Sequence, residues 1–212
     1  NDRQEFDNVG LMINVEARGP WGPALLFEAC PGNSKVMDLY ASNASYPYTY
    51  SLTTVVYEFM PNFTDFTIVK DSIPGLNFST ITDVNRYHTH LDNFDNISQK
   101  SIQHYGEQIL PLALKYVTDQ AYSDTEALKS EDDAVNFTIP LLGMFNFSKI
   151  GYTIVNVVIF VLFLLLFAVT VHHSFFCNSV GFDRCIDFLL KLFQIEISLM
   201  LFRLEISFLM NG

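Results

Sequence analysis

The sequence predicts an α/β fold followed by a membrane-spanning helix. Up to about residue 118, short apolar runs of strand length alternate with longer segments whose apolar residues recur at helical spacing. Further on, residues 150–171 form a run of 22 residues without a formal charge. Such a run is long enough to cross the apolar core of a bilayer, which is about 30 Å thick. The two patterns predict one part that folds in water and one that inserts in lipid.

Three runs predict strands. Residues 10–15 and 24–27 are compact and apolar, and the segment 19–23 between them is rich in glycine and proline. We therefore expect the first two strands to be adjacent in the sheet, joined by a tight turn. Residues 74–81 form the third strand-like run. A polar loop, residues 86–92, follows this strand.

Four segments predict helices. In chain order they are residues 34–42 with Asn33 or Ser34 as the cap, residues 51–60, residues 64–70, and residues 98–117. The last of these is the longest, and its apolar residues recur at helical spacing. Pro111 lies inside it and should kink or break it, because proline lacks the N–H that a helix interior needs.

The composition excludes one class of partner. The formal net charge is −11 and the pI is near 4.7, so the chain offers no basic face for the phosphates of a nucleic acid. The three cysteines, Cys30, Cys177 and Cys185, are too widely spaced for a disulfide framework or a zinc knuckle. We interpret them as structural thiols.

The C-terminal half predicts membrane association. Residues 119–149 form an acidic linker, residues 150–171 the membrane span, and residues 172–212 an apolar tail interrupted by charges. A charge at the centre of a span costs about 2.5–3.5 kcal/mol, so we favour an interfacial helix for the tail, with a second membrane segment as the alternative. A weak basic excess beyond the span favours an extracytoplasmic or lumenal N-terminal half.

The loop at residues 86–92 has the composition of part of a metal site. His88 and His90 are one residue apart, and Asp92 follows two residues later. In open α/β sheets, ligands bind in loops just beyond the carboxyl ends of strands, and a neutral imidazole is a common metal ligand. The alternative is a solvated polar turn with two surface histidines. Spacing alone leaves both interpretations open.

Five motifs follow one another along the chain: residues 14–19, 22–28, 60–67 and 74–78, and the triplet Tyr87-His88-Thr89. In this order they resemble the di-zinc aminopeptidases of metallopeptidase family twenty-eight. They are most similar to the membrane-bound branch that includes the endoplasmic-reticulum metallopeptidase and the vacuolar membrane protease. The resemblance covers about residues 8–118. It implies part of a three-layer sheet with flanking helices, corresponding to the C-terminal part of a peptidase domain.

The resemblance implies two metal ligands in this chain. Glu16, at the end of its strand, matches an acidic ligand to one zinc ion, and His88 matches the imidazole ligand to the second. His90 has no ligand role by this alignment. Asp65 matches an acidic position near the site, where it would orient other groups, or it is simply a favourable charge at a helix N-terminus. Asp92 would steady His88 or cap the next turn.

The implied activity is zinc-dependent removal of N-terminal residues from peptides by a membrane-anchored enzyme. Two zinc ions would activate a water molecule and polarise the scissile carbonyl, and a general base would take the proton of that water. Only 15 residues precede Glu16, and neither a general base nor a bridging ligand can be assigned. We therefore expect an incomplete chain that is inactive by itself. The alternative is a non-catalytic, membrane-tethered binding or assembly module that keeps the peptidase scaffold.

Overall fold

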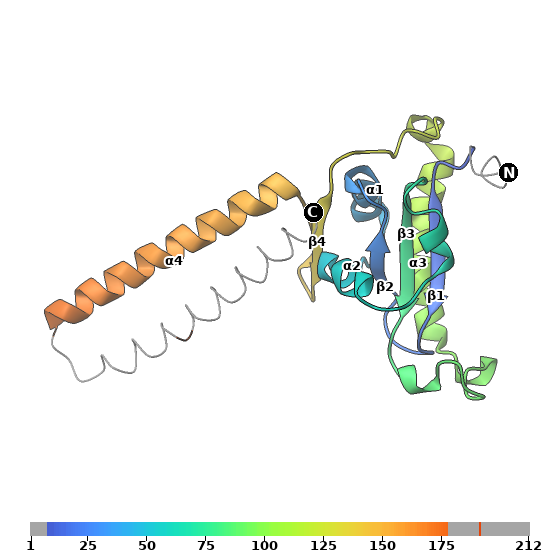
Figure 1. Ribbon diagram of the computed structural model, residues 1–212, viewed down its shortest axis with the longest axis horizontal. Coiled ribbons are helices and arrows are strands. Elements are labelled where there is room, and N and C mark those ends of the chain that lie inside the picture. Colours follow the sequence, from blue (N-terminus) through green and yellow to red (C-terminus); the bar gives the residue numbers. More distant parts are fainter. Residues whose placement is uncertain (1–7, 178–190, 192–212) are drawn as a thin grey trace. The chain divides into compact units, whose positions relative to one another are not determined.

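The computed structural model describes residues 8–177 and residue 191 (Figure 1). The chain divides after Tyr152 into two compact units. The first unit holds every strand of the described part of the chain and the helices α1, α2 and α3. The second holds most of the apolar helix α4. The mixture of helices and strands confirms the α/β class.

A three-stranded sheet is the centre of the first unit. Its order is β1 (Met12–Ala17), β3 (Gly75–Thr80) and β2 (Leu25–Ala29), with β3 parallel to β1 and antiparallel to β2. The expectation that the first two strands are adjacent was wrong, because β3 lies between them. All six residues of β3 are buried, whereas Val15 and Ala17 of β1 are exposed. The strand that can be covered on both faces therefore takes the centre, and β1 takes an edge.

Strand β2 carries a bulge that sets the direction of its side chains. The register shifts between Leu26, which pairs with Phe78, and Glu28, which pairs with Asn77. A bulge inserts one extra residue into one strand of a pair. The inserted Phe27 packs edge-on against Tyr57 of α2 (Ser51–Glu58), with ring centroids 4.9 Å apart.

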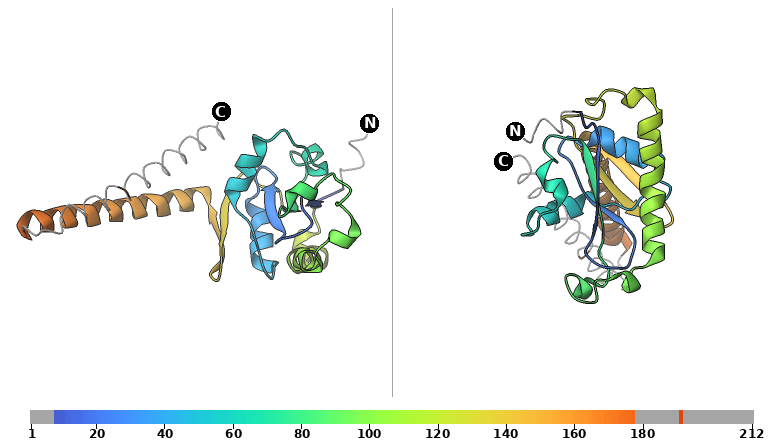
Figure 2. Two further views of the ribbon diagram at one scale, coloured as in Figure 1. Left: turned by 90° about the horizontal axis from the view of Figure 1, so that it is seen from below. Right: turned by 90° about the vertical axis from the view of Figure 1, so that its right-hand side faces the viewer.

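The main core lies between the sheet and the helices α1 (Ser34–Asn43) and α3 (Gln99–Thr118). Figure 2 shows α3 running alongside the sheet. The buried side chains of this core come from strands and helices far apart in the sequence: Leu26, Leu76, Phe78, Val36, Met37, Leu39, Tyr40 and Leu112. Cys30 is buried in the same cluster, as expected for a structural thiol, and burial raises its pKa.

Of the two outcomes expected at Pro111, a kink or a break, the break does not occur, because helix α3 continues through this residue. Ser98 caps its N-terminus by accepting a hydrogen bond from the Ser101 N–H. Proline removes the N–H that would bond to the carbonyl four residues earlier. In this fold that carbonyl, on Glu107, accepts a hydrogen bond from the Ser45 N–H at 3.1 Å instead. The lost bond is therefore replaced from the loop after α1.

The remaining short elements are 3₁₀ turns: η2 (Asp65–Ile68), η3 (Val84–Arg86), η4 (Phe94–Asn96) and η5 (Gln120–Tyr122). The helix expected over residues 64–70 is thus a 3₁₀ turn. At the start of α1, Asn33 occupies the cap position without a side-chain capping bond. Its side-chain oxygen instead accepts a hydrogen bond from the Ala134 N–H at 2.8 Å.

Residues 119–149, for which the sequence predicts an acidic linker, contain a β-hairpin. Strand β4 (Ala134–Ile139) pairs antiparallel with β5 (Gly143–Ser148). The Thr49 hydroxyl donates to the side-chain oxygen of Asn136, and the Thr138 N–H donates to the Thr49 carbonyl. These bonds join the hairpin to the segment before α2, within the first unit.

Helix α4 (Lys149–Cys177) is the apolar helix expected from the sequence. Within the described residues, one helical segment, Lys149–His172, has the length and the apolar composition needed to cross a membrane. Its most apolar window has a mean hydropathy of 3.1. No part of that window is buried against other described residues. The predicted tail, residues 172–212, lies almost entirely outside the described residues.

Candidate metal-binding edge of the sheet

Glu16 lies at the carboxyl end of β1, at the point where the parallel strand β3 also ends. It pairs with Ser79 in the register of the two strands. Its side chain is partly buried, and one carboxylate oxygen accepts a hydrogen bond from the Asn14 amide at 3.3 Å. The Tyr105 hydroxyl of α3 donates to the Glu16 carbonyl at 2.5 Å and accepts the Thr80 N–H at 2.6 Å. Helix α3 therefore fixes the ends of both strands.

A row of polar side chains crosses the sheet beneath Glu16. Asn14 of β1, Asn77 of β3 and Glu28 of β2 occupy paired positions on neighbouring strands, and each is less than 10% exposed. The Asn14 amide donates to the Asn77 side-chain oxygen at 2.9 Å, and the Asn77 amide donates to Glu28 at 2.9 Å. Lys70 forms an ion pair with Glu28 at 2.8 Å. A continuous chain of contacts thus joins Lys70 to Glu16.

Sequence reasoning did not identify this row. A signal was present, because Asn14, Asn77 and Glu28 each stand between two apolar residues of their strands. Polar groups in a sheet interior are costly unless they are hydrogen-bonded. Which of them meet depends on the strand order and on the β2 bulge, which the sequence did not predict.

Tyr57 brings a buried hydroxyl to the same face of the sheet. Its side chain is 8% exposed, and its hydroxyl makes no hydrogen bond within the described part of the chain. The Arg18 guanidinium lies 5.6 Å from the centre of its ring. Burial raises the pKa of Tyr57, and the negative charges of Glu28 and Glu16 act in the same direction. The hydroxyl is therefore a neutral donor close to the two carboxylates.

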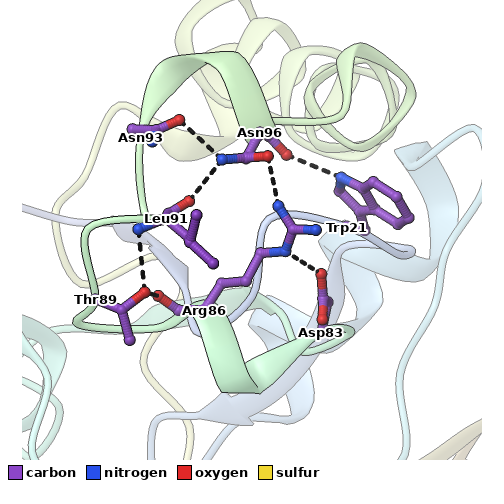
Figure 3. Close-up of polar contacts among 7 residues, drawn as sticks. All are labelled: Trp21, Asp83, Arg86, Thr89, Leu91, Asn93 and Asn96. Atoms are coloured by element: carbon purple, nitrogen blue, oxygen red, sulfur yellow. Dashed lines mark hydrogen bonds and ion pairs between the residues drawn. The ribbon is translucent and has the colours of Figure 1, made fainter.

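The loop that carries His88 is held to the chain leaving β1 (Figure 3). Arg86 is central to this contact: it pairs with Asp83 at 2.5 Å, donates to the Asn96 side-chain oxygen, and stacks over the Trp21 ring at 5.7 Å. The Trp21 indole N–H donates to the Asn96 carbonyl at 2.8 Å. The Asn96 amide donates to the Leu91 carbonyl, which closes the loop on itself. We call Trp21, Asp83, Arg86 and Asn96 the loop clasp.

His88 is exposed on this loop, beyond the carboxyl end of β3. Its backbone has φ of 57°, the left-handed region that a non-glycine residue rarely adopts. Its ring stacks on Tyr87 with centroids 3.8 Å apart. The carboxylate of Asp92 accepts the His88 backbone N–H at 3.3 Å, so Asp92 contacts the main chain rather than the imidazole. His90 is also exposed.

Asp65 is exposed at the first position of η2. The preceding Thr64 forms a capping box with Thr67 and accepts a hydrogen bond from the Asn77 amide at 2.9 Å. Asp65 thus adjoins the polar row and also supplies an acidic charge to a helical first turn. The geometry is compatible with both roles that the sequence left open.

The donors at this edge suit a zinc ion in part. Carboxylate oxygen and imidazole nitrogen are both common zinc ligands, and a catalytic site uses three protein ligands. Glu16 lies near the carboxyl end of β1, and His88 lies in the loop that follows the neighbouring parallel strand β3. Within residues 8–177 and 191, however, no group of three His, Cys, Asp or Glu side chains is close enough to hold a metal. The described residues therefore offer a partial donor set.

Comparison with known proteins identifies the family. Residues 1–113 match the model of Peptidase family M28. The chain belongs to this family. Membership makes it part of a group of peptidases and explains the order of motifs along the first half of the sequence. No solved structure matches the chain significantly.

The similar curated proteins are named as endoplasmic-reticulum metallopeptidases or vacuolar membrane proteases. Endoplasmic reticulum metallopeptidase 1 of Mus musculus is 36% identical over 127 residues, which is 58% of this chain and 14% of that protein. The Homo sapiens protein of that name is 34% identical over 70% of this chain and 17% of its own length. Vacuolar membrane protease of Candida dubliniensis is 28% identical over 74% of this chain and 16% of its own length. The resemblance to the membrane-bound branch is confirmed, and the chain spans about a sixth of these relatives.

Proposed function

We propose that this chain is part of a membrane-anchored, zinc-dependent aminopeptidase and contributes one ligand to each of two zinc ions. The observation that supports the proposal is a carboxylate, Glu16, near the carboxyl end of β1 and an imidazole, His88, in the loop after the parallel strand β3, in a chain of Peptidase family M28. The substrates would be peptides with a free N-terminus.

The residues of this chain would bind and orient the metal. Glu16 would offer the carboxylate oxygen that Asn14 does not already occupy, and His88 would offer a ring nitrogen from an exposed loop. The loop clasp would hold His88 in reach of the sheet edge. Zinc, when bound, supplies the Lewis acidity that activates water and polarises the scissile carbonyl.

The chain alone is proposed to be inactive. Among the described residues no third ligand joins Glu16 and His88, and none is assigned as the general base. The same observation favours the second candidate, a membrane-tethered binding or assembly module on the peptidase scaffold. Zinc binding alone does not distinguish the peptidase from the binding module. Peptide hydrolysis by a longer chain with the full ligand set would exclude the binding module.

We also propose a three-layer domain on the extracytoplasmic or lumenal side of a membrane crossed by α4. The main core against α1 and α3 on one face of β3, and the contacts of Thr64, Lys70 and Tyr57 on the other, support the layers. Apolar side chains are exposed along most of α4, which is unfavourable in water and favourable in lipid. The endoplasmic-reticulum and vacuolar membrane relatives support the location.

Zinc titration tests the metal site. The full chain in detergent micelles is titrated with zinc against a chromogenic chelator, and Glu16→Ala and His88→Ala are each expected to weaken binding on the order of tenfold or more. Glu131→Ala and His90→Ala are the matched controls, because both side chains are exposed and neither has a ligand role. Unchanged zinc affinity in both Glu16→Ala and His88→Ala would disprove the site.

A further inference from the structure

The polar row beneath Glu16 has only one arrangement that satisfies its hydrogen bonds. Glu28 is fully buried, and a carboxylate can only accept. One of its oxygens contacts the Lys70 ammonium at 2.8 Å, so the other must face a donor. That donor is the Asn77 amide nitrogen at 2.9 Å, which directs its second hydrogen to the Thr64 hydroxyl oxygen.

The orientation of Asn77 decides the orientation of Asn14. With its nitrogen toward Glu28, Asn77 presents its oxygen to β1, and only the nitrogen of Asn14 can meet it. The second hydrogen of that nitrogen is then directed at one carboxylate oxygen of Glu16, at 3.3 Å. Each amide hydrogen in the row therefore has an acceptor.

We propose that Glu28 and Lys70 are positioning residues for the metal ligand Glu16. Their ion pair sets the direction of two buried amides, and the second amide holds one oxygen of the Glu16 carboxylate so that the other faces the metal. This inference rests on the proposed zinc site and extends it to two residues on β2 and after η2 that would not touch the metal. Outer partners of this kind typically change metal affinity by about 10–100-fold.

A neutral residue at position 28 removes the constraint. Glutamine at that position can present either a donor or an acceptor, so the two asparagine amides can both invert. The inverted row would place the Asn14 side-chain oxygen against the Glu16 carboxylate, and the two acceptors would repel. Glu16 would then lose the contact that orients it.

Zinc affinity of the full chain in micelles tests the inference, with zinc chloride as the only ligand. The double variant Glu28→Gln/Lys70→Met removes both charges together, so that no unpaired buried charge remains. We expect it to weaken zinc binding on the order of tenfold. Lys70→Arg keeps the ion pair and is expected to bind zinc like the unmodified chain. Asn14→Ala, which cuts the row next to Glu16, should match the double variant.

Two controls separate positioning from folding. The thermal midpoint is measured without zinc for every variant, and affinities are compared for those with a cooperative transition; Asn14→Ala serves if the double variant does not fold. In a Glu16→Ala background, Glu28→Gln/Lys70→Met should cause no further loss of zinc affinity.

The outcomes distinguish this inference from the proposed function. If folded variants of the row bind zinc within twofold of the unmodified chain, or if the loss persists in the Glu16→Ala background, Glu28 and Lys70 do not position Glu16. If Glu16→Ala itself leaves zinc affinity unchanged, the metal site fails, and the inference fails with it.

Discussion

At the scale of single residues, His104 shows how burial defines a charge state. It is half-buried on α3, and its Nδ1 accepts the Ala24 N–H at 2.9 Å, which requires a ring without a proton at that atom. Burial lowers the pKa of His104 below its usual 6.5, and the weaker attraction of the Glu107 carboxylate does not reverse this. Unlike His88 and His90, which are exposed, this histidine has a structural role.

Stability is therefore expected to depend on pH through His104. Because its pKa is lower in the folded chain than in the unfolded chain, the unfolded chain binds more protons below pH 6.5. The stability that the neutral His104 ring contributes is complete above pH 6.5 and is lost as the pH falls. In His104→Gln, whose side-chain oxygen can accept the same N–H, denaturant unfolding should show a smaller loss between about pH 6.5 and pH 5. Equal losses in both chains would contradict this assignment.

At the scale of elements, two contacts between distant segments shape the fold. The turn before α1 meets the segment before β4: the Gly32 N–H donates to Asp133, and Gly32 has φ of 65°. The loop clasp similarly joins the residues after β1 to the loop after β3. Both contacts fix loops that short-range patterns describe only as polar.

Two glycines should respond to alanine in opposite directions. A Cβ at Gly32 would lie 1.9 Å from the Ser130 carbonyl oxygen, so Gly32→Ala should lower the free energy of unfolding by roughly 1–3 kcal/mol. A Cβ at Gly106, inside α3, meets nothing within 4 Å. Gly106→Ala should raise the free energy of unfolding by about 0.5–1 kcal/mol, because alanine has a higher helix propensity than glycine. Denaturant unfolding measures both, and a stabilising Gly32→Ala would argue against this packing.

The loop clasp can be opened without unfolding the domain. Arg86→Ala removes the ion pair to Asp83, the bond to Asn96 and the stacking on Trp21. We expect faster amide hydrogen exchange over residues 83–96 and a global stability change within about 1 kcal/mol, since these groups are partly exposed. Lys100→Ala, an exposed residue of α3, is the control. Unchanged exchange in Arg86→Ala would show that other contacts hold the loop.

At the scale of the whole molecule, the chain combines a packed α/β unit with a helix suited to lipid. Six Asn-x-Ser/Thr sequons report on the side of the membrane: Asn43, Asn62, Asn77, Asn96, Asn136 and Asn146. Burial distinguishes them. Asn77 is 0% exposed and Asn136 5% exposed, whereas Asn62 is partly exposed in the turn after α2 and its amide makes no hydrogen bond within the described residues.

Glycan mapping therefore tests the proposed lumenal location. In a eukaryotic host, mass spectrometry of the folded, membrane-extracted chain should find a glycan on Asn62 and none on Asn77 or Asn136, because both of these side chains are buried and the Asn77 amide nitrogen already donates two hydrogen bonds. Asn62→Gln should remove the signal. A glycan on Asn77 would contradict the buried row, and an unmodified Asn62 would contradict the lumenal location.

The sequence by itself determined the features that depend on neighbouring residues. The strand-like runs, the long helix from residue 98, the apolar helix after residue 149, and Glu16 and His88 as candidate ligands all follow from local pattern or from a motif order that names the family.

Only the tertiary structure decided which segments meet. The placing of β3 between β1 and β2, the β2 bulge and the hydrogen-bonded row of Asn14, Asn77 and Glu28 depend on pairing between residues about fifty or more positions apart. Such pairing is favoured by burial on both faces and by the need to satisfy buried polar groups, which are properties of the assembled sheet.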